Sequence, residues 1–270
     1  PQGWLSSRTG HHFHAAREFP EEALGKLADC YVEIGSKTGG FDTGLARSEK
    51  SLTDFVSRAN SLLGTVGVGL GVAGMVRFFA DATAKAGDLA ETMSKVDQVF
   101  GQSKGAVLDM AESMAFQFGA VKQTTLDAAS MFGLIAQGAG MSEKEAAALS
   151  VRLARLADDA SSFYNTSLDV ALEKIRAGLV GESEPLRAFG VMLSETAVQQ
   201  KALSMGLAAS TKELDEQAKV AARAQLIMEG LAKATGDHER TMGSLNNQLK
   251  KFRGEWENFK TEVGNQFMTG

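Results

Sequence analysis

Proline is scarce in this sequence of 270 residues, which contains only three. Pro1 and Pro20 lie near the start, so Pro185 is the only proline in the long remainder. Because proline removes a backbone donor and breaks a helix interior, this distribution permits long helices almost throughout the chain. Aromatic residues make up only 7% of the sequence, whereas strands are enriched in them. The composition therefore predicts an all-α fold.

Cysteine and clustered positive charge are also lacking. The single cysteine, Cys30, has no second cysteine with which to form a disulfide or a zinc site. The net charge is −5 at pH 7, with both signs mixed along the chain, so we predict no stable nucleic-acid binding. No HExxH, GxSxG, P-loop or paired-cysteine motif occurs. The sequence therefore predicts no enzyme activity, cofactor or metal.

The N-terminal part divides into two segments. Residues 1–28 lack the apolar stretch of a signal peptide and are predicted to be an irregular leader outside the main domain. Their only cluster of note is His11-His12-x-His14, which has no acidic or cysteine ligand at suitable spacing, so we interpret it as solvated. Residues 29–61 are expected to combine a short strand at Tyr31–Ile34 with a first helix from Thr43.

The third segment, 62–76, is apolar and rich in glycine. Gly67 and Gly71 have the small-xxx-small spacing of helices that pack in membranes. The uncharged run is nevertheless shorter than the roughly 20 residues needed to cross a bilayer. We interpret the segment as a flexible or closely packed hinge. The alternative is contact with a membrane through this segment, with Gly64–Gly74 inserting as a hairpin.

The fourth segment, 77–270, is predicted to be helical; one apolar series spans its start, beginning at Met75 in the third segment, and another marks its end. In both, apolar residues recur at steps of three and four that alternate, apart from a repeated four at the end of the second series, which is typical of helices that pack along a seam as in coiled coils. The second series is still continuing at the last residue, which predicts a truncated C-terminal end. The first helix seam comprises Met75, Phe79, Ala82, Ala86, Leu89, Met93, Val96 and Phe100; the second comprises Met242, Leu245, Leu249, Phe252, Trp256, Phe259, Val263 and Phe267.

Capping signals place several helix ends. Ser142 with Glu145 forms a capping-box pattern for a helix that reaches about Phe163. Gly181 is suited to the C-terminal cap of the following helix.

Two more helices are expected after this point. Pro185 suits the first turn of a helix that runs to about Gly206. A second capping-box pattern, Ser210 with Glu213, predicts a helix that continues to about Ala234.

Two charged groups are candidates for acid–base chemistry. In Asp237–Glu239, adjacent helical residues point in different directions and do not converge on a substrate, so we interpret them, His238 included, as a solvated connecting segment. In the pair Asp158 and Asp159, the second residue lies four positions after Arg155, which predicts an ordinary surface ion pair.

An ordered series of motifs is the most distinctive part of the chain: Lys174–Gly181, Glu184–Gly190, Leu193–Ala197, Arg223–Met228, Asp237–Thr241 and Ser244–Leu249. This series resembles the N-terminal conserved region of phage tail tape measure proteins, and the resemblance extends from about Tyr31 to the end. It assigns no catalytic or ligand-binding residue. The signature positions that carry it are Gly181, Glu184, Pro185, Leu186, Phe189, Gly190, Leu193 and Ala197.

The resemblance implies an extended helical bundle with coiled-coil-like helices. It implies a structural protein of the virion tail, assembled in the host cytoplasm, that scaffolds tail-tube polymerisation and sets tail length. The implied partners are tail-tube proteins, tail-tip or baseplate proteins, tail assembly chaperones and further copies of the chain. The resemblance leaves open whether the segment 62–76 also makes transient contact with a membrane. The family's long downstream rod and its cell-wall hydrolase modules are missing from this sequence.

Two other interpretations fit the composition. The first is a membrane-active helical protein, similar to a pore-forming toxin, that inserts the segment 62–76. The second is a generic coiled-coil adaptor, although such a protein would not share the ordered series of motifs.

Overall fold

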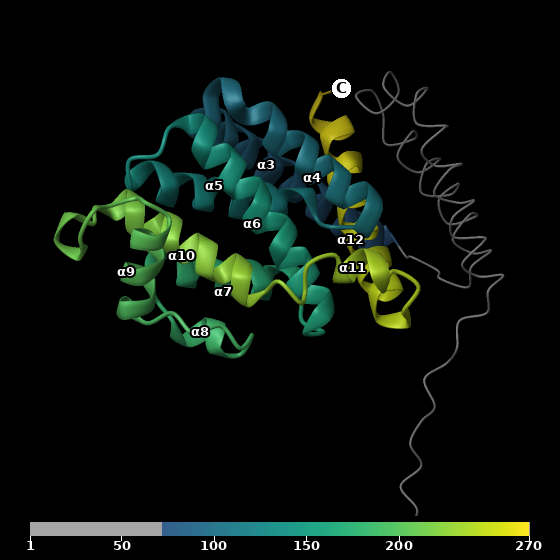
Figure 1. The fold of residues 1–270 in the computed structure, drawn as a ribbon. Coiled ribbons are helices and arrows are strands. Elements are labelled where there is room, and N and C mark those ends of the chain that lie inside the picture. Colours follow the sequence, from purple (N-terminus) through teal and green to yellow (C-terminus); the bar gives the residue numbers. More distant parts are fainter. Residues whose placement is uncertain (1–71, 270) are drawn as a thin grey trace, which may run out of the picture. The chain divides into compact units, whose positions relative to one another are not determined.

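The structure is a computed structural model that describes residues 72–269. All secondary structure in this range is helical, and no strand occurs among these residues, which confirms the all-α class for them. The leader 1–28 and the segment 29–61, with its expected strand and first helix, lie outside the described residues. Phe78–Thr269 forms one compact unit (Figure 1). The α-helices are α3 (Val72–Phe100), α4 (Lys104–Phe118), α5 (Lys122–Gly138), α6 (Glu143–Phe163), α7 (Leu168–Val180), α8 (Glu184–Arg187), α9 (Glu195–Ser204), α10 (Glu216–Gly230), α11 (Asp237–Arg240) and α12 (Leu245–Thr269), with 3-10 turns η2 (Gly101–Ser103) and η3 (Thr211–Glu213).

Helix α3 contains the first predicted seam. It begins at Val72, so the last residues of the predicted hinge 62–76 are helical, and the rest of the hinge lies outside the described residues. It ends where Gly101 adopts a φ of 47° and starts η2. The side chain of Met75 lies outside the described part of the chain. Phe79 is half-buried beside Phe78. The other seam residues are buried or packed against the core: Ala82, Ala86, Leu89, Met93, Val96 and Phe100.

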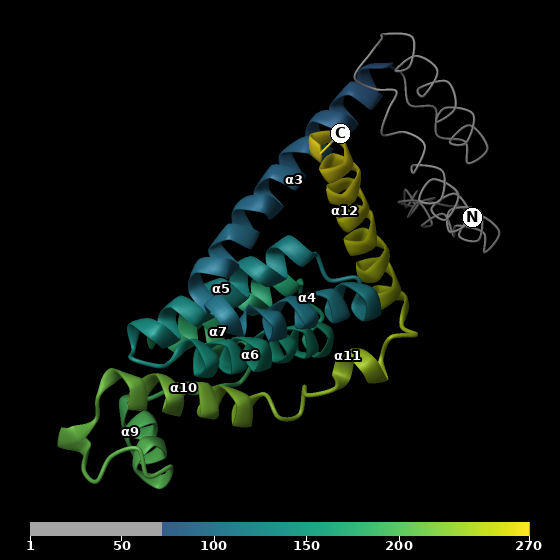
Figure 2. The ribbon, with the colours of Figure 1, turned by 90° about the horizontal axis from the view of Figure 1, so that it is seen from above.

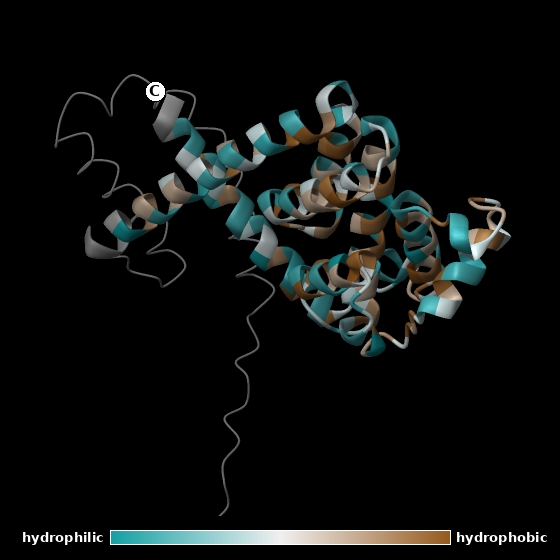
Figure 3. Cartoon of the chain, turned by 90° about the vertical axis from the view of Figure 1, so that its left-hand side faces the viewer, coloured by the Kyte–Doolittle hydropathy of each residue, from teal (hydrophilic) through white to brown (hydrophobic). Residues whose placement is uncertain are grey.

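Helix α6 lies at the centre of the bundle. It contacts α4, α5, α7, α10 and α11, and it is buried on most of its surface because alanine and serine fill the positions between its leucines. Figure 3 shows hydrophobic residues gathered between the packed helices. The largest fully buried side chains are Phe100, Met110, Met114, Phe132, Leu153, Ile175, Leu179, Leu186, Ile227 and Leu231.

Two predicted helix ends are confirmed. Ser142 caps α6, its hydroxyl accepting from the Glu145 backbone N–H while the Glu145 carboxylate accepts from the Ser142 N–H. Gly181 ends α7 in the left-handed conformation, with φ 101°. In both cases the capping atoms belong to residues close in sequence, which is why the sequence alone could place them.

The two helices predicted after Gly181 are wrong in extent. Pro185 does start a helix, but α8 has only four residues, because the chain turns at Gly190 with φ 74° before Ser194 caps α9. The predicted capping box at Ser210 forms only the short turn η3. Helix α10 starts later, where Asp215 accepts a hydrogen bond from the backbone N–H of Ala218.

Candidate functional site

The segment after α7 folds back over that helix and contains most signature positions. Leu186 of α8 is fully buried and contacts Gly178 of α7, where a Cβ atom would collide with the leucine side chain. The Leu186 side chain therefore packs directly against the backbone of α7 at Gly178, where a larger residue would force the leucine to shift.

Phe189 fixes the next part of this segment. Its ring stacks on Tyr164, with 4.5 Å between the ring centroids, and the Tyr164 hydroxyl donates a hydrogen bond to the Phe189 carbonyl oxygen at 2.6 Å. Lys174 Nζ lies 5.4 Å from the centre of the Phe189 ring and donates to the Pro185 carbonyl oxygen at 3.3 Å. These contacts join the end of α6, α7 and α8.

The remaining signature positions also have structural surroundings. Leu193 is buried, and the backbone N–H of Ala197 donates to the Ser194 hydroxyl at the start of α9. Glu184 is exposed and pairs with Arg187 at 2.9 Å. The signature thus builds a connection between helices and gathers no reactive groups.

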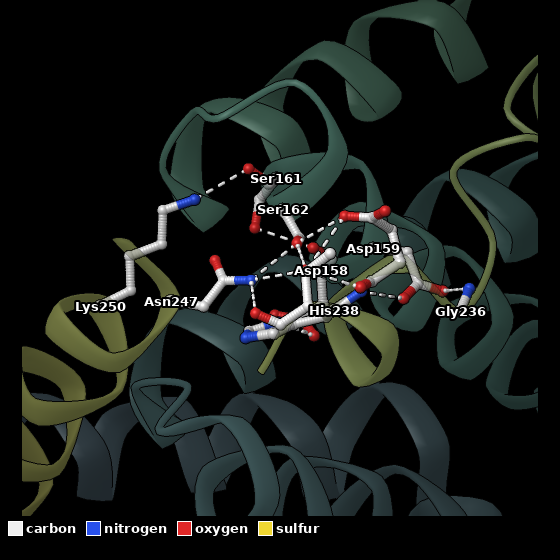
Figure 4. A network of polar contacts seen from close by, with 10 residues as sticks. Asp158, Asp159, Ser161, Ser162, Gly236, His238, Asn247 and Lys250 are labelled. Atoms are coloured by element: carbon white, nitrogen blue, oxygen red, sulfur yellow. Dashed lines mark hydrogen bonds and ion pairs between the residues drawn. The ribbon is translucent and has the colours of Figure 1, made fainter. Parts of the chain in front are cut away.

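A buried polar network joins α6 to the C-terminal part of the chain (Figure 4). Asp158 Oδ2 lies 2.7 Å from His238 Nδ1, and the two side chains are only 6% and 5% exposed. The His238 ring also stacks on Phe118 at the end of α4, with 4.5 Å between centroids. The prediction that His238 belongs to a solvated segment is therefore wrong, because α11 directs this side chain toward α4 and α6.

Asp159 belongs to the same network. Its carboxylate accepts hydrogen bonds from the backbone N–H groups of Gly236 at 2.7 Å and His238 at 3.3 Å. Among the described residues it makes no ion pair with Arg155, so the predicted surface pair is wrong. The physical reason is that the start of α11 offers N–H groups without helical partners, and these bind a carboxylate well.

Ser162 and Lys250 extend the network to α12. The Ser162 hydroxyl donates to Asp237 Oδ2 at 2.7 Å and accepts from Asn247 Nδ2 at 2.9 Å. Lys250 Nζ donates to the Ser161 carbonyl oxygen at 2.9 Å. Asn247 and Lys250 lie in the first turns of α12, and Ser161 and Ser162 lie on α6. These hydrogen bonds therefore hold the start of α12 against α6.

Burial shifts two ionisable groups of the network. Burial raises the pKa of Asp159 above 3.8, and this outweighs the hydrogen bonds from Gly236 and His238, which lower it. Burial also lowers the pKa of Lys250 below 10.5, and this outweighs the negative charge of Asp158, which raises it. In both residues the charged form is disfavoured by the loss of water.

The network does not have the geometry of nucleophilic catalysis. The Ser162 hydroxyl bonds to Asp237 and Asn247, whereas an activated serine would bond to the His238 ring. Within 72–269, no three histidine, cysteine, aspartate or glutamate side chains are placed to hold a metal ion. What the arrangement does physically is join α6, α11 and α12 through hydrogen bonds shielded from water.

One signal in the sequence points to the buried pair. Ser150, Ala154 and Ser161 lie on a face of α6 that is fully buried, and Asp158 follows Ala154 by one turn on that face. A carboxylate on a face of small residues requires a partner from another element. The sequence does not say which element supplies it, because His238 is 80 residues away along the chain.

Helix α12 is docked through glycines and polar side chains. A Cβ atom at Gly254 would collide with the Gly119 carbonyl oxygen at the end of α4, and one at Gly264 would collide with the Ala82 carbonyl oxygen of α3. Between these crossings, Asn258 Nδ2 donates to the Ala120 carbonyl oxygen at 2.8 Å. Figure 2 shows α12 meeting α3 near the C-terminus of the chain.

Ion pairs reinforce the crossing of α12 and α3. Lys260 Nζ lies 2.8 Å from Asp81 and 2.9 Å from Glu257, and Lys85 lies 2.8 Å from the same glutamate. Burial by itself raises the pKa of Glu257, but the hydrogen bonds from Lys85 and Lys260 outweigh it and hold the pKa below 4.5. These four residues are called the α3–α12 clasp.

The second predicted seam is divided in two by this docking. Phe259 and Val263 are half-buried, whereas the earlier positions are more exposed, although the Trp256 ring still lies 6.0 Å from the ring of Phe78 in α3. Leu245 is 70% exposed, and Phe252 and Trp256 are 44% and 43% exposed. We call this surface the outer ridge; it comprises Met242, in the turn before α12, and Leu245, Leu249, Phe252 and Trp256 of α12. Phe267 has no described side chain.

A hollow of about 470 Å³ lies between α6, α10 and the loop after α9. Its apolar lining includes Met205 and Leu207, both exposed, and its polar lining includes Glu145, Arg152 and Asp215. We call it the methionine groove; its large apolar residues are Met141, Leu149, Met205, Leu207 and Met228.

Comparison with known proteins adds no relative to these observations. No family model matches the chain, and neither a curated protein nor a solved structure shows significant similarity to it. The resemblance based on the signature positions therefore stays a prediction.

Proposed function

We propose that this chain is a region of a phage tail tape measure protein, a helical scaffold around which tail-tube subunits polymerise and whose length sets that of the tail. The observation that carries the proposal is the ordered series of motifs from Lys174 to Leu249. The positions of Leu186 and Phe189, which seat α8 on α7, support a structural use of the signature.

The proposed mechanism is mechanical. An α-helix rises 1.5 Å per residue, so a protein built of extended helices converts residue number into physical length. The proposal includes a coiled-coil-like assembly of several copies, with tail-tube, tail-tip or baseplate proteins and assembly chaperones as partners. The outer ridge of α12 supports such contacts, because a contiguous row of exposed apolar side chains is typical of an interaction surface.

The length relation gives a direct test. In the phage or prophage that encodes the chain, we expect an in-frame deletion of about 60 residues from the long helical rod that the resemblance implies to shorten the tail by about 90 Å. Electron microscopy of purified particles measures this change, and an equal in-frame duplication is the matched control, which should lengthen the tail by the same amount. Tails of unchanged length in both strains would overturn the proposal.

The gene neighbourhood provides a second test. We expect the reading frame to continue past Gly270 for hundreds of helical residues, beside genes for tail-tube and baseplate proteins. A stop codon soon after Gly270, with no tail genes nearby, would remove the basis for a ruler function.

A membrane-active protein is the alternative outcome. It is motivated by the uncharged segment 62–76, most of which lies outside the described residues. Among residues 72–269, no helix has the length and apolar character to cross a bilayer. Liposome flotation of the full chain, compared with Val68→Asp and Leu70→Asp variants, tests this alternative: binding that both substitutions abolish would favour it.

A further inference from the structure

Helix α12 is attached to the rest of the unit at two places that differ in charge. Its first turns are joined to α6 through Asn247 and Lys250 of the buried polar network, in which His238 joins α11 to the same helix. Further along, the α3–α12 clasp joins α12 to α3, at the crossing that Figure 2 shows near the C-terminus. We propose that acid acts on these two attachments in opposite directions, so that the crossing with α3 opens while the start of α12 stays on α6.

The clasp depends on ionised carboxylates. Glu257 lies between two lysines, Lys85 of α3 and Lys260 of α12, each within 2.9 Å of it. When Glu257 and Asp81 take up protons, these attractions disappear, and the two lysines remain charged and repel each other. The contact between α3 and α12 thus changes from attractive to repulsive.

Proton linkage gives the direction of this change. The hydrogen bond from Lys260 lowers the pKa of Asp81 below 3.8. Burial by itself raises the pKa of Glu257, but the lysine hydrogen bonds outweigh it and hold this pKa below 4.5. The stabilisation by the clasp is therefore complete above these ordinary values and is lost as the pH falls through the lower pKa values of the folded state.

The buried polar network differs because one of its carboxylates has no cation beside it. Asp159 accepts hydrogen bonds from the backbone N–H groups of Gly236 and His238, and it forms no ion pair with any residue of 72–269. Its neighbour Asp158 carries the same negative charge. Protonation of Asp159 therefore removes a repulsion, and its carbonyl oxygen can still accept the hydrogen bond from Gly236.

Linkage at Asp159 runs opposite to that in the clasp. Burial raises the pKa of Asp159 above 3.8, the charge of Asp158 adds to this, and the hydrogen bonds from Gly236 and His238 oppose it without outweighing it. A carboxyl group with a raised folded pKa stabilises the fold fully below its ordinary pKa, and this stabilisation is lost as the pH rises through the folded value. Asp159 thus favours the docking of α11 in acid, where the clasp is lost.

The other charged groups of α6 and α11 do not reverse this direction. Asp158 binds His238, and protonation of the ring turns this hydrogen bond into a charge-assisted ion pair. Asp237 pairs with Arg240 of its own helix at 3.4 Å, so this ion pair does not join α11 to α6.

The groups that α4 and α12 bring to the network, and those in the middle of α12, are insensitive to acid. Phe118 contributes a neutral ring. Acid removes no positive charge from Lys250, which keeps its hydrogen bond to the Ser161 carbonyl oxygen. In the middle of α12, the neutral Asn258 side chain donates to the Ala120 carbonyl oxygen. Opening is therefore confined to the part of α12 beyond Asn258.

The part that opens covers apolar surface of α3. Gly264 lies against the backbone of Ala82 and beside the side chain of Ala86, and both alanines are fully buried. Acid therefore uncovers the start of the first seam without unfolding the bundle.

Neutral variants of the full chain test the inference at pH 7, where acid unfolding does not interfere. Asp81→Asn with Glu257→Gln imitates the protonated clasp, and Asp159→Asn imitates the protonated network. Hydrogen exchange should become about fivefold faster in residues 260–269 of the clasp variant and stay unchanged in 237–250. In Asp159→Asn it should become slower in 237–250. The matched control Asp109→Asn, an exposed carboxylate of α4, should change neither segment.

A milder variant guards against a disturbed fold. Lys85→Gln keeps the pair between Lys260 and Asp81, so it should speed up exchange in 260–269 less than the clasp variant while α5 keeps its protection. In the wild type, protection relative to unstructured peptides should fall in 260–269 before it falls in 237–250 as the pH is lowered to about 3.

Three results would overturn the inference: unchanged exchange in 260–269 of both clasp variants, equal loss of protection in 237–250 and 260–269, or faster exchange in 237–250 of Asp159→Asn. None of these results depends on tail assembly.

Discussion

The central bundle and the C-terminal helix are both helical, yet they are held by different kinds of contact. In α4–α7 the buried side chains are mainly apolar, with Phe132 and Met114 among the largest. In α12 the buried residues are Asn247, Gly254, Thr261 and Gly264, and the large apolar side chains of its first half face outward. The difference shows that apolar burial stabilises the bundle, whereas glycine contacts and hydrogen bonds position α12.

This contrast has an energetic consequence. A fully buried large apolar side chain contributes about 1.5–3 kcal/mol, and a hydrogen bond contributes a net of only about 0.5–1.5 kcal/mol. We therefore expect α12 to separate from the bundle at a lower free energy than the bundle needs to unfold, as parts with little apolar burial commonly do.

The largest effect is expected in the bundle. Replacement Phe132→Ala should lower the free energy of unfolding by about 3–5 kcal/mol, because it leaves a cavity in the core. Urea denaturation measures this loss. The control Leu134→Ala changes an exposed neighbour on the same helix and should cost less than about 0.5 kcal/mol. A similarly small loss of unfolding free energy in both variants would contradict the view that apolar burial stabilises the bundle.

Next in size is the buried pair. Replacement Asp158→Ala leaves His238 buried without its partner and should destabilise the docking of α11 and α12 by about 3 kcal/mol. Hydrogen exchange should speed up in α11 and α12 while α5 keeps its protection. The control Asp109→Ala removes an exposed carboxylate of α4 and should change neither region. Equal loss of protection in α5 would mean that both regions unfold as one.

A smaller, local effect is expected at the glycine crossing. In most helix interiors Gly→Ala is stabilising by about 0.5–1 kcal/mol, and Gly87→Ala in α3 should behave in this way because nothing lies within 4 Å of the added carbon. At Gly254 the same change forces α12 away from Gly119, so we expect a loss of about 1–3 kcal/mol from overpacking. Thermal melting should show a higher melting temperature for Gly87→Ala and a lower one for Gly254→Ala than for the wild type. A stabilising Gly254→Ala would show that α12 does not rest on α4.

The smallest effect is a pH dependence of the α3–α12 clasp. The hydrogen bond from Lys260 lowers the pKa of Asp81 below its ordinary value of 3.8, and the pKa of Glu257 also lies below its ordinary value of 4.5. The two carboxylates therefore stabilise the folded protein fully above these ordinary values. That stabilisation is lost as the pH falls through the lower pKa values of the folded state. Burial lowers the pKa of Lys260, but its hydrogen bonds to Asp81 and Glu257 raise it above 10.5 overall. The contribution of Lys260 is therefore complete below pH 10.5 and is lost as pH rises through the folded pKa.

Trp256 reports on this clasp because its ring lies 6.0 Å from Phe78 and 5.6 Å from Phe259. In a Trp4→Phe background, we expect its fluorescence to be constant at intermediate pH and to change below about pH 4. A Lys260→Met variant, which lacks the ion pairs to Asp81 and Glu257 and keeps only the one between Lys85 and Glu257, should show a weaker change. The same acid transition in both chains would mean that the clasp does not hold α12.

The success of sequence reasoning depended on the distance between interacting residues. The capping box at Ser142 and the cap at Gly181 use atoms within three or four positions, so local sequence predicted them correctly. The helix expected from Pro185 to Gly206 was wrong because Leu186 is drawn onto Gly178 of another helix and the chain turns at Gly190. A tertiary contact of this kind leaves little trace in local periodicity.

The polar network shows the same limit at the candidate site. Asp158 and His238 were each recognised as ionisable residues, but as exposed ones. Their pairing needs α11 to arrive beside α6, and the chain between them spans several helices. With no alternation or motif connecting the two positions, a surface interpretation was the natural expectation from sequence.

For this protein the sequence by itself determined the helical class, several helix ends and the apolar row along α12. Only the tertiary structure decided which side of α12 faces the bundle. A second row, formed by Asn247, Gly254, Thr261 and Gly264, runs along the other side of the helix, and the glycines let its backbone approach those of α3 and α4. Periodicity states which residues share a face; the close approach of backbones and the hydrogen bonds of buried polar groups select the face that is docked.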